Sequence, residues 1–172
     1  CLPLRPLQDG DLVKVARPLS EDHAILRPSL TPGLLATAEN NLRQGAKNLR
    51  FFEAGRQFRN VGGGKATDLE ADSIALLLGG EASPLSWTRD ENRQLDLYDL
   101  KAAIQAALGN RSIQFTTRAR EGFLLSGDIQ LSGKPIGTFA QIMPSRAREI
   151  GFKAPIYLAE LDQKKVLGIK QD

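Results

Sequence analysis

The amino-acid sequence predicts an α+β domain built on a mainly antiparallel sheet flanked by helices. Two stretches, residues 31–45 and 96–109, carry apolar residues at helical spacing between capping and stop signals. Several short apolar runs are joined by connections short enough for hairpins. No run of alternating strand and helix units is present, so a parallel sheet is not expected.

The first predicted helix begins at Thr31 and ends at Gly45. Thr31 can accept a hydrogen bond from an orphan backbone N–H, Pro32 has the fixed φ that suits the first helical position, and Gly45 can adopt a left-handed conformation. One apolar stripe is formed by Leu30, Leu34, Leu35, Ala38 and Leu42. The apolar, aromatic run Leu49–Phe58 then predicts a strand in the centre of the sheet.

The next segment combines a glycine-rich loop with a buried strand. Gly62-Gly63-Gly64-Lys65 resembles a phosphate loop, but Ala66 stands where the Walker pattern needs serine or threonine, so we expect an exposed hairpin tip over 60–68. Residues 73–78 predict a strand buried on both faces. Trp87, the only tryptophan, is expected to pack under a short helical turn in 84–92.

The second half of the chain predicts one longer helix and a hairpin. Residues 97–108 form the helix, with Asp96 as its cap and Gly109 as its stop. Strands are expected over 113–115, 124–131, 135–142 and 156–161, the middle two turning at Ser132-Gly133-Lys134. Helical turns are expected over 144–150 and 163–167.

Composition indicates one soluble domain in a reducing compartment. A chain of 172 residues with 41% hydrophobic and 25% charged residues can form one sizeable core, which argues against disorder. The longest apolar runs are far shorter than a membrane span requires, and no leader pattern is present. Cys1 is the only cysteine, so no internal disulfide can form and we expect a cytoplasmic protein. The start without methionine suggests a fragment of a longer chain.

The net charge is +3, from 23 basic and 20 acidic residues that are interspersed. This spacing is typical of a solvated face, and a phosphate-binding surface is the alternative. The basic residues cluster loosely in two groups: Arg43, Lys47, Arg50, Arg56 and Arg59, and then Arg118, Arg120, Arg146 and Arg148.

The passage from helix to strand resembles the β subunit of bacterial phenylalanine–tRNA ligase, the larger, non-catalytic partner in that heterotetrameric class II synthetase. Matching residues in the first third are Pro18, Leu19, Ser20, Leu26, Arg27, Ser29, Leu30, Pro32, Gly33, Leu34, Leu35, Asn41, Phe52, Glu53, Gly55 and Phe58. Further matches are Asp96, Leu97, Asp99, Leu100, Lys101 and the stretch Tyr157–Asp162. The family's His-Pro-Gly element is missing near Gly122–Ser126, so no role tied to it is carried over.

The resemblance implies a degenerate copy of the class II synthetase sheet. It implies a module over residues 12–168, preceded by a truncated entry segment, 1–11, and followed by a tail, 169–172. In the family a motif 1 helix and strand precede this region and form much of the contact between subunits. The residues before Leu12 are too few and too rich in proline to supply that helix.

The resemblance also implies where catalytic groups would stand and that they are missing. Active class II sites have a motif 2 arginine, an acidic residue two positions later, and a second arginine from a glycine-rich element near the C-terminus. These groups meet charge that develops on phosphate oxygens. Arg59 takes the position of the motif 2 arginine, but Val61 stands two positions later, where the acidic residue would be. The segment Glu160–Lys165 has neither the glycines nor the second arginine. We therefore predict no catalytic, cofactor-binding or metal-binding residues here, with ATP and Mg²⁺ bound at the α-subunit site.

Other constellations do not point to catalysis either. His23 is the only histidine, which excludes a site built on two histidines, and Cys1 stands at a terminus. The acidic pairs Asp68/Glu70 and Asp96/Asp99 are expected to serve capping and solubility.

Three functions remain open at this stage. The first is a non-catalytic scaffold that supports the catalytic α subunit, with tRNA as a partner of the holoenzyme and a homodimer as a further state of the fragment. The second is an independent RNA-binding module that uses the basic hairpin, although the interleaved Glu53, Asp68, Glu70 and Asp72 weaken its positive face. The third is an active adenylating enzyme, which predicts pyrophosphate exchange with phenylalanine and ATP.

Overall fold

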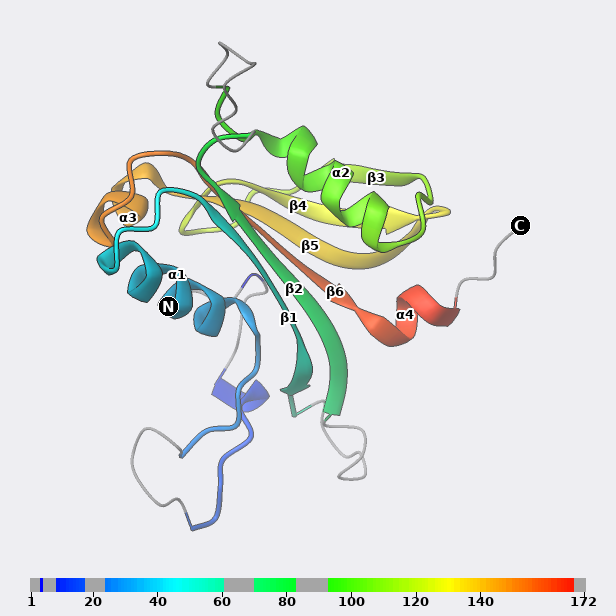
Figure 1. The fold of residues 1–172 in the computed structure, drawn as a ribbon. Coiled ribbons are helices and arrows are strands. Elements are labelled where there is room, and N and C mark those ends of the chain that lie inside the picture. Colours follow the sequence, from blue (N-terminus) through cyan, green and yellow to red (C-terminus); the bar gives the residue numbers. More distant parts are fainter. Residues whose placement is uncertain (1–3, 5–8, 18–23, 61–69, 83–92, 169–172) are drawn as a thin grey trace.

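The computed structural model describes residues 4, 9–17, 24–60, 70–82 and 93–168. Within them, six strands form one sheet in the order β1-β2-β6-β5-β4-β3, and every neighbouring pair is antiparallel (Figure 1). The strands are β1 (Leu49–Phe58), β2 (Glu70–Gly79), β3 (Ile113–Thr117), β4 (Phe123–Leu131), β5 (Lys134–Ile142) and β6 (Ile156–Asp162). The predicted α+β class is confirmed.

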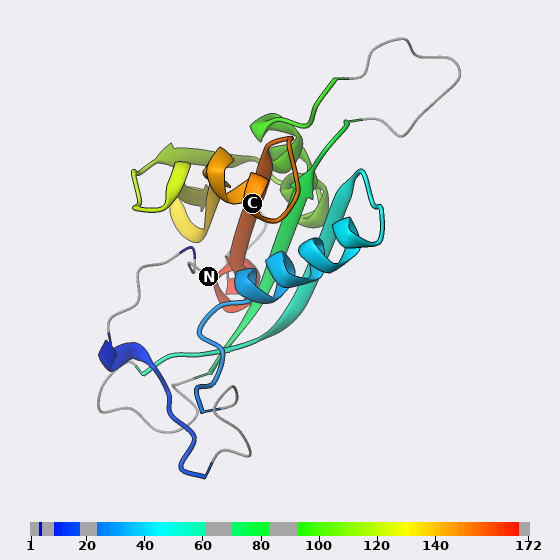
Figure 2. The ribbon, with the colours of Figure 1, turned by 90° about the vertical axis from the view of Figure 1, so that its left-hand side faces the viewer.

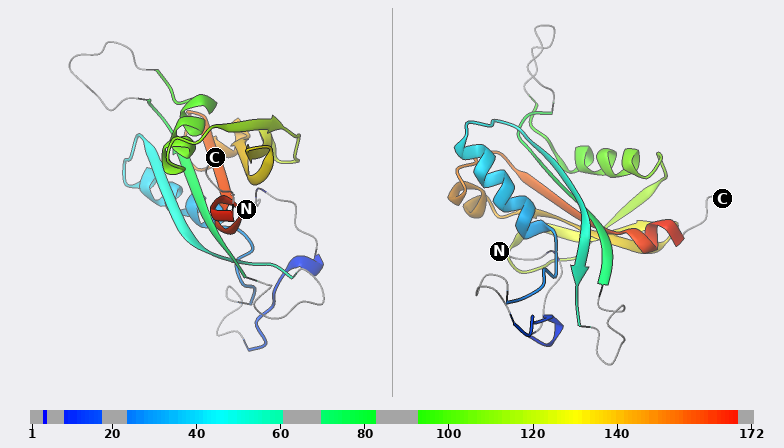
Figure 3. Two further views of the ribbon diagram at one scale, coloured as in Figure 1. Left: turned by 90° about the vertical axis from the view of Figure 1, so that its right-hand side faces the viewer. Right: turned by 60° about the horizontal axis from the view of Figure 1, so that its bottom comes forward.

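Helices cover both faces of the sheet, so the domain has two hydrophobic cores. α1 (Thr31–Arg43) and α3 (Pro144–Glu149) lie on one face, in front of the strands in Figure 2. α2 (Leu97–Ala107) and α4 (Gln163–Gly168) lie on the other face, which the left-hand view of Figure 3 turns towards the reader. Alternate residues of β6 serve the two cores: Leu158 packs on the α1 side and Ala159 on the α2 side.

The prediction that Leu49–Phe58 is a central strand is wrong. β1 lies at the edge of the sheet, and β6 and β2 occupy the interior. Burial alternates along β1, and the side chain of Phe52 is 78% exposed. An apolar run indicates a strand but does not give its place in the sheet. The prediction that residues 73–78 form a strand buried on both faces is confirmed by β2.

The other strand and helix predictions are confirmed with small shifts of their ends. β4 and β5 are joined by Ser132 and Gly133, whose φ angles of 49° and 73° give the two-residue turn that suits a twisted hairpin. The predicted turns over 144–150 and 163–167 are α3 and α4. The predictions for the hairpin tip over 60–68 and for Trp87 lie on residues outside the described ones, apart from Asn60.

Thr31 does not cap α1, so that prediction is wrong. Leu30 takes the cap position without a side-chain hydrogen bond, and the hydroxyl of Thr31 lies 2.9 Å from Ser29 Oγ. The acceptor for the helix start comes from the central strand instead, because the Leu30 backbone N–H donates to Glu160 Oε2 at 3.0 Å. The prediction for Gly45 is confirmed: its φ is +92°, and the Ala46 and Gly45 amides bond to Asn41 and Leu42 carbonyls.

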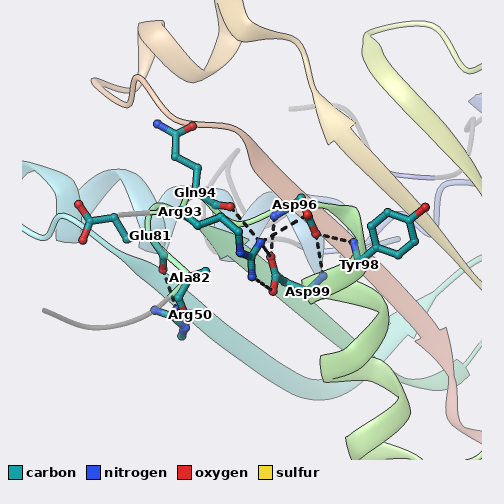
Figure 4. A network of polar contacts seen from close by, with 8 residues as sticks. All are labelled: Arg50, Glu81, Ala82, Arg93, Gln94, Asp96, Tyr98 and Asp99. Atoms are coloured by element: carbon teal, nitrogen blue, oxygen red, sulfur yellow. Dashed lines mark hydrogen bonds and ion pairs between the residues drawn. The ribbon is translucent and has the colours of Figure 1, made fainter. Parts of the chain in front are cut away.

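α2 is capped as the sequence predicts. Asp96 accepts from the backbone N–H groups of Tyr98 and Asp99, and Asp99 accepts from the Asp96 N–H in return, which forms a capping box. Arg93 donates two hydrogen bonds of 2.7 Å to the Asp99 carboxylate (Figure 4). Gly109 ends the helix with a φ of +69°.

Residues near the N-terminus are attached to the same domain. Leu4 is buried in the core on the α1 side, and the Asn60 N–H donates to the Asp11 carbonyl at 2.9 Å. Among the described residues, no helix has both the length and the apolar character needed to cross a membrane.

Candidate functional site

A cavity of about 550 Å³ opens where several connections meet the sheet. Its walls carry four basic side chains: Arg59 after β1, Arg118 and Arg120 between β3 and β4, and Lys165 in α4. Arg59 and Lys165 come from the two segments compared above with the catalytic elements of class II enzymes. Folding therefore brings these segments, more than 100 positions apart, to one cavity.

Two of the cavity's arginines share one carboxylate. Arg120 has a side chain only 9% exposed and donates to Asp128 Oδ1 at 2.6 Å and to the Gly127 carbonyl at 2.8 Å. Arg118 is largely exposed, and its Nη1 lies 3.6 Å from Asp128 Oδ2. Arg118 and Arg120 were noted in the sequence only as loosely clustered basic residues. Asp128, which forms ion pairs with both arginines, carries no sequence pattern that indicates a binding site, because its neighbours in sequence are ordinary strand residues.

Arg59 and Lys165 both have structural contacts. Arg59 Nε donates to the Pro28 carbonyl at 3.2 Å, which ties the end of β1 to the segment before α1. Asp162 accepts from the Lys165 backbone N–H at 3.1 Å, and its other carboxylate oxygen lies 3.7 Å from Lys165 Nζ. Val61, the residue on which the prediction of inactivity rested, lies outside the described residues.

Thr138 in β5 also lines the cavity and was missed in the sequence. The residue is only 3% exposed, and its Oγ1 has no hydrogen-bond partner within the described part of the chain. Its backbone pairs with Asp128 on one side and with Glu160 on the other. A single threonine in an apolar strand carries no sequence signal for a site, because threonine is common in strands.

Glu160 stands in the other segment compared with a catalytic element, and it performs a structural task. The residue is 4% exposed, and its Oε2 accepts from Ser29 Oγ at 2.7 Å as well as from the Leu30 N–H. The carboxylate therefore joins β6 to the start of α1. Among the described residues, no group of three or more histidine, cysteine, aspartate or glutamate side chains is arranged to hold a metal ion.

The arginines of the β1–β2 hairpin contact carboxylates and backbone carbonyls rather than forming an open basic face. Arg56 lies 3.2 Å from Glu70 and 3.6 Å from Asp72. Arg50 donates to the carbonyls of Glu81 and Ala82, both at 2.8 Å (Figure 4). Cys1, His23, Lys65 and Asp68, also considered in the sequence, lie outside the described residues.

The acidic pair Asp96/Asp99 has the capping role that the sequence predicts, with a marked electrostatic effect. The hydrogen bonds from Arg93 are the main cause that lowers the pKa of Asp99 to about 2. Burial acts in the opposite direction and is outweighed. This carboxylate therefore stays charged at any pH near neutrality and serves the start of α2.

Two curated proteins that are similar in sequence carry the same name, phenylalanine–tRNA ligase β subunit. The chain is 34% identical over 162 residues to the phenylalanine–tRNA ligase β subunit of Novosphingobium aromaticivorans, covering 89% of this chain and 20% of that protein. It is 34% identical over 159 residues to the same subunit of Xanthomonas campestris, covering 90% of this chain and 20% of that protein. The chain thus spans about a fifth of the length of the curated relatives it matches.

Solved structures show the same fold at low sequence identity. A pyrrolysyl-tRNA synthetase from Desulfitobacterium hafniense superposes with a TM-score of 0.64 at 19% identity, covering 91% of this chain and 52% of that one. This likeness shows a class II synthetase-like fold. The family model described as the phenylalanyl-tRNA synthetase β chain CLM domain matches residues 4–163, and the chain belongs to this family.

Proposed function

We propose that this chain is a non-catalytic, synthetase-like scaffold module of the phenylalanine–tRNA ligase β subunit. Its role is to support assembly with the catalytic α subunit, which binds ATP and Mg²⁺ and charges tRNA with phenylalanine in the cytoplasm. The proposal rests on family membership together with one observation: polar groups at the compared catalytic positions hold the domain together. Arg59 binds the Pro28 carbonyl, and Glu160 binds Ser29 and Leu30.

Exposed apolar side chains support a role in assembly. Phe52 in β1 and Tyr98 in α2 are 78% and 79% exposed, and Leu124 in β4 is 53% exposed. Large aromatic side chains of this kind are enriched at protein interfaces. The hairpin's arginines, by contrast, contact carboxylates and carbonyls, which does not favour the RNA-binding alternative.

The assembly test uses a full-length β subunit that contains this chain. Removing residues 12–168 should abolish co-purification with the α subunit, because the supporting surface is lost. Full-length β chains carrying Phe52→Ser or Tyr98→Ser serve as point variants, and Arg43→Ala, an exposed helix residue, is their matched control. Assembly at the normal level after the deletion would show that support for the α subunit lies elsewhere.

Catalysis is tested separately on the chain itself. We expect no exchange of pyrophosphate into ATP in the presence of phenylalanine, because Arg59 and Glu160, in the segments compared with catalytic elements, are engaged in contacts within the domain. The assembled holoenzyme is the positive control. Exchange by the isolated chain above background would contradict the non-catalytic role while leaving the family assignment intact.

A further inference from the structure

We propose that the basic cavity beside β5 binds a small anion that carries a phosphate group. Its volume of about 550 Å³ lies within the range of small-molecule sites and exceeds that of one phosphate. Among the described residues, four cations line it against two carboxylates, Asp128 and Glu121. This binding site goes beyond the scaffold role and does not depend on it.

Two cations of the cavity, Arg118 and Lys165, keep donors available. Arg118 Nη1 is 3.6 Å from Asp128, and Lys165 Nζ is 3.7 Å from Asp162. Both distances exceed a hydrogen bond, although they are ion pairs in the wider sense. Asp128 already accepts a 2.6 Å hydrogen bond from Arg120, so its charge is shared between two guanidinium groups. With Asp162 counted beside Lys165, the four described cations still outnumber the three carboxylates, so an oxyanion in the cavity would meet an excess of positive charge.

The buried hydroxyl of Thr138 supports an anion site independently of the charges. Its Oγ1 is buried and has no hydrogen-bond partner in the described part of the chain, although the residue lines the cavity. Buried hydroxyl groups are nearly always paired, so an unpaired one needs a reason. A hydroxyl on a residue that lines a cavity together with cations matches an oxyanion, which accepts several hydrogen bonds that are strengthened by its charge.

The first test measures binding of inorganic phosphate to the 172-residue chain. Thermal unfolding is followed at rising phosphate concentration, with chloride at equal ionic strength as the reference, and calorimetry gives the Kd. We expect phosphate alone to raise the unfolding temperature, because a ligand of the folded state stabilises it. The double variant Arg118→Ala/Lys165→Ala should weaken phosphate binding at least tenfold. Arg148→Ala, which removes an exposed cation outside the cavity, should leave the Kd unchanged.

The second test uses Thr138→Val, which keeps the shape of the side chain and removes the hydroxyl. Because that hydroxyl has no partner among the described residues, the unfolding temperature without phosphate should be unchanged or higher. Phosphate affinity should nevertheless fall severalfold. A lower unfolding temperature without ligand would show an internal structural role for the hydroxyl and would overturn its proposed role in phosphate binding.

Further ligands separate the possible sources of the phosphate group. Pyrophosphate and metal-free ATP should compete with inorganic phosphate, and this competition should be lost in the double variant. The proposal fails if phosphate has no effect beyond that of chloride, or if Arg148→Ala weakens binding as much as the double variant. It also fails if an RNA oligonucleotide binds the chain and phosphate cannot displace it.

Discussion

At the scale of single residues, Glu160, a carboxylate in a segment compared with a catalytic element, serves the structure of the domain. It lies in the central strand, is almost fully buried, and accepts hydrogen bonds from Ser29 and Leu30 at the start of α1. A charge near a helix N-terminus is stabilised by the helix dipole and by the unpaired N–H groups there. Glu160 thereby fixes α1 against the sheet.

The contribution of this carboxylate can be measured by two substitutions. Glu160→Ala should lower the free energy of unfolding by about 3 kcal/mol, because two buried donors lose their acceptor. Glu160→Gln keeps an acceptor oxygen and should cost about 1 kcal/mol. Urea unfolding gives both values, and Glu149→Ala on the exposed face of α3 is the control. Equal losses for the alanine and glutamine variants would contradict an acceptor role.

At the scale of elements, α1 and α2 are fixed at their N-termini in different ways. α2 carries its own capping box, Asp96 and Asp99, whereas α1 depends on a residue 130 positions away. Local patterns could therefore predict the start of α2 and the ends of both helices at Gly45 and Gly109. They could not predict the start of α1, because Thr31 is a good capping residue whose place is taken by a distant carboxylate.

The Arg93–Asp99 pair makes stability depend on pH in a defined window. The pKa of Asp99 is lowered from 3.8 to about 2, so folding favours the charged form. The stabilisation is complete above about pH 4 and is lost as the pH falls towards 2. Asp99→Asn should reduce stability at neutral pH by about 1 to 2 kcal/mol, since Arg93 is partly exposed, and most of the difference from the parent should be lost at pH 2.

Asp72→Asn is the matched control for this measurement. Asp72 is half exposed and lies 3.6 Å from Arg56, so its removal should change stability very little. Denaturant unfolding of both variants from pH 2 to pH 7 gives the comparison. A constant difference for Asp99→Asn across this range would exclude the proposed origin of the effect.

At the scale of the whole molecule, one sheet supports both cores, and its interior strands are shared by them. The fold class, both long helices and the hairpin could be predicted because their signals are local. The sheet order could not, because Leu49–Phe58 and Ile156–Asp162 are similar apolar runs although one lies at the edge and the other inside. In the site, the resemblance pointed to Arg59 and Glu160–Lys165, whereas Asp128 and Thr138 become neighbours only through strand pairing.

Hydrogen exchange should reflect this arrangement. The amides of β6 and β2 should exchange most slowly, because both strands are paired on two sides and buried on both faces. The amides of β1 and β3 that face away from their single partner strand should exchange much faster. Mass spectrometry of peptides from each strand provides the measurement, with α1 as an internal reference. Equal protection of β1 and β6 would contradict the described order.

The position of β6 also sets the order in which the chain can fold during synthesis. Of the six described strands, β6 is synthesised last, yet it connects the pair β1-β2 to the meander β3-β4-β5 and carries the acceptor for α1. Until residue 162 has emerged from the exit tunnel, the nascent polypeptide holds two unjoined halves with exposed apolar faces. Apolar surface and strand edges that stay uncovered during translation make such a partly folded chain prone to aggregation.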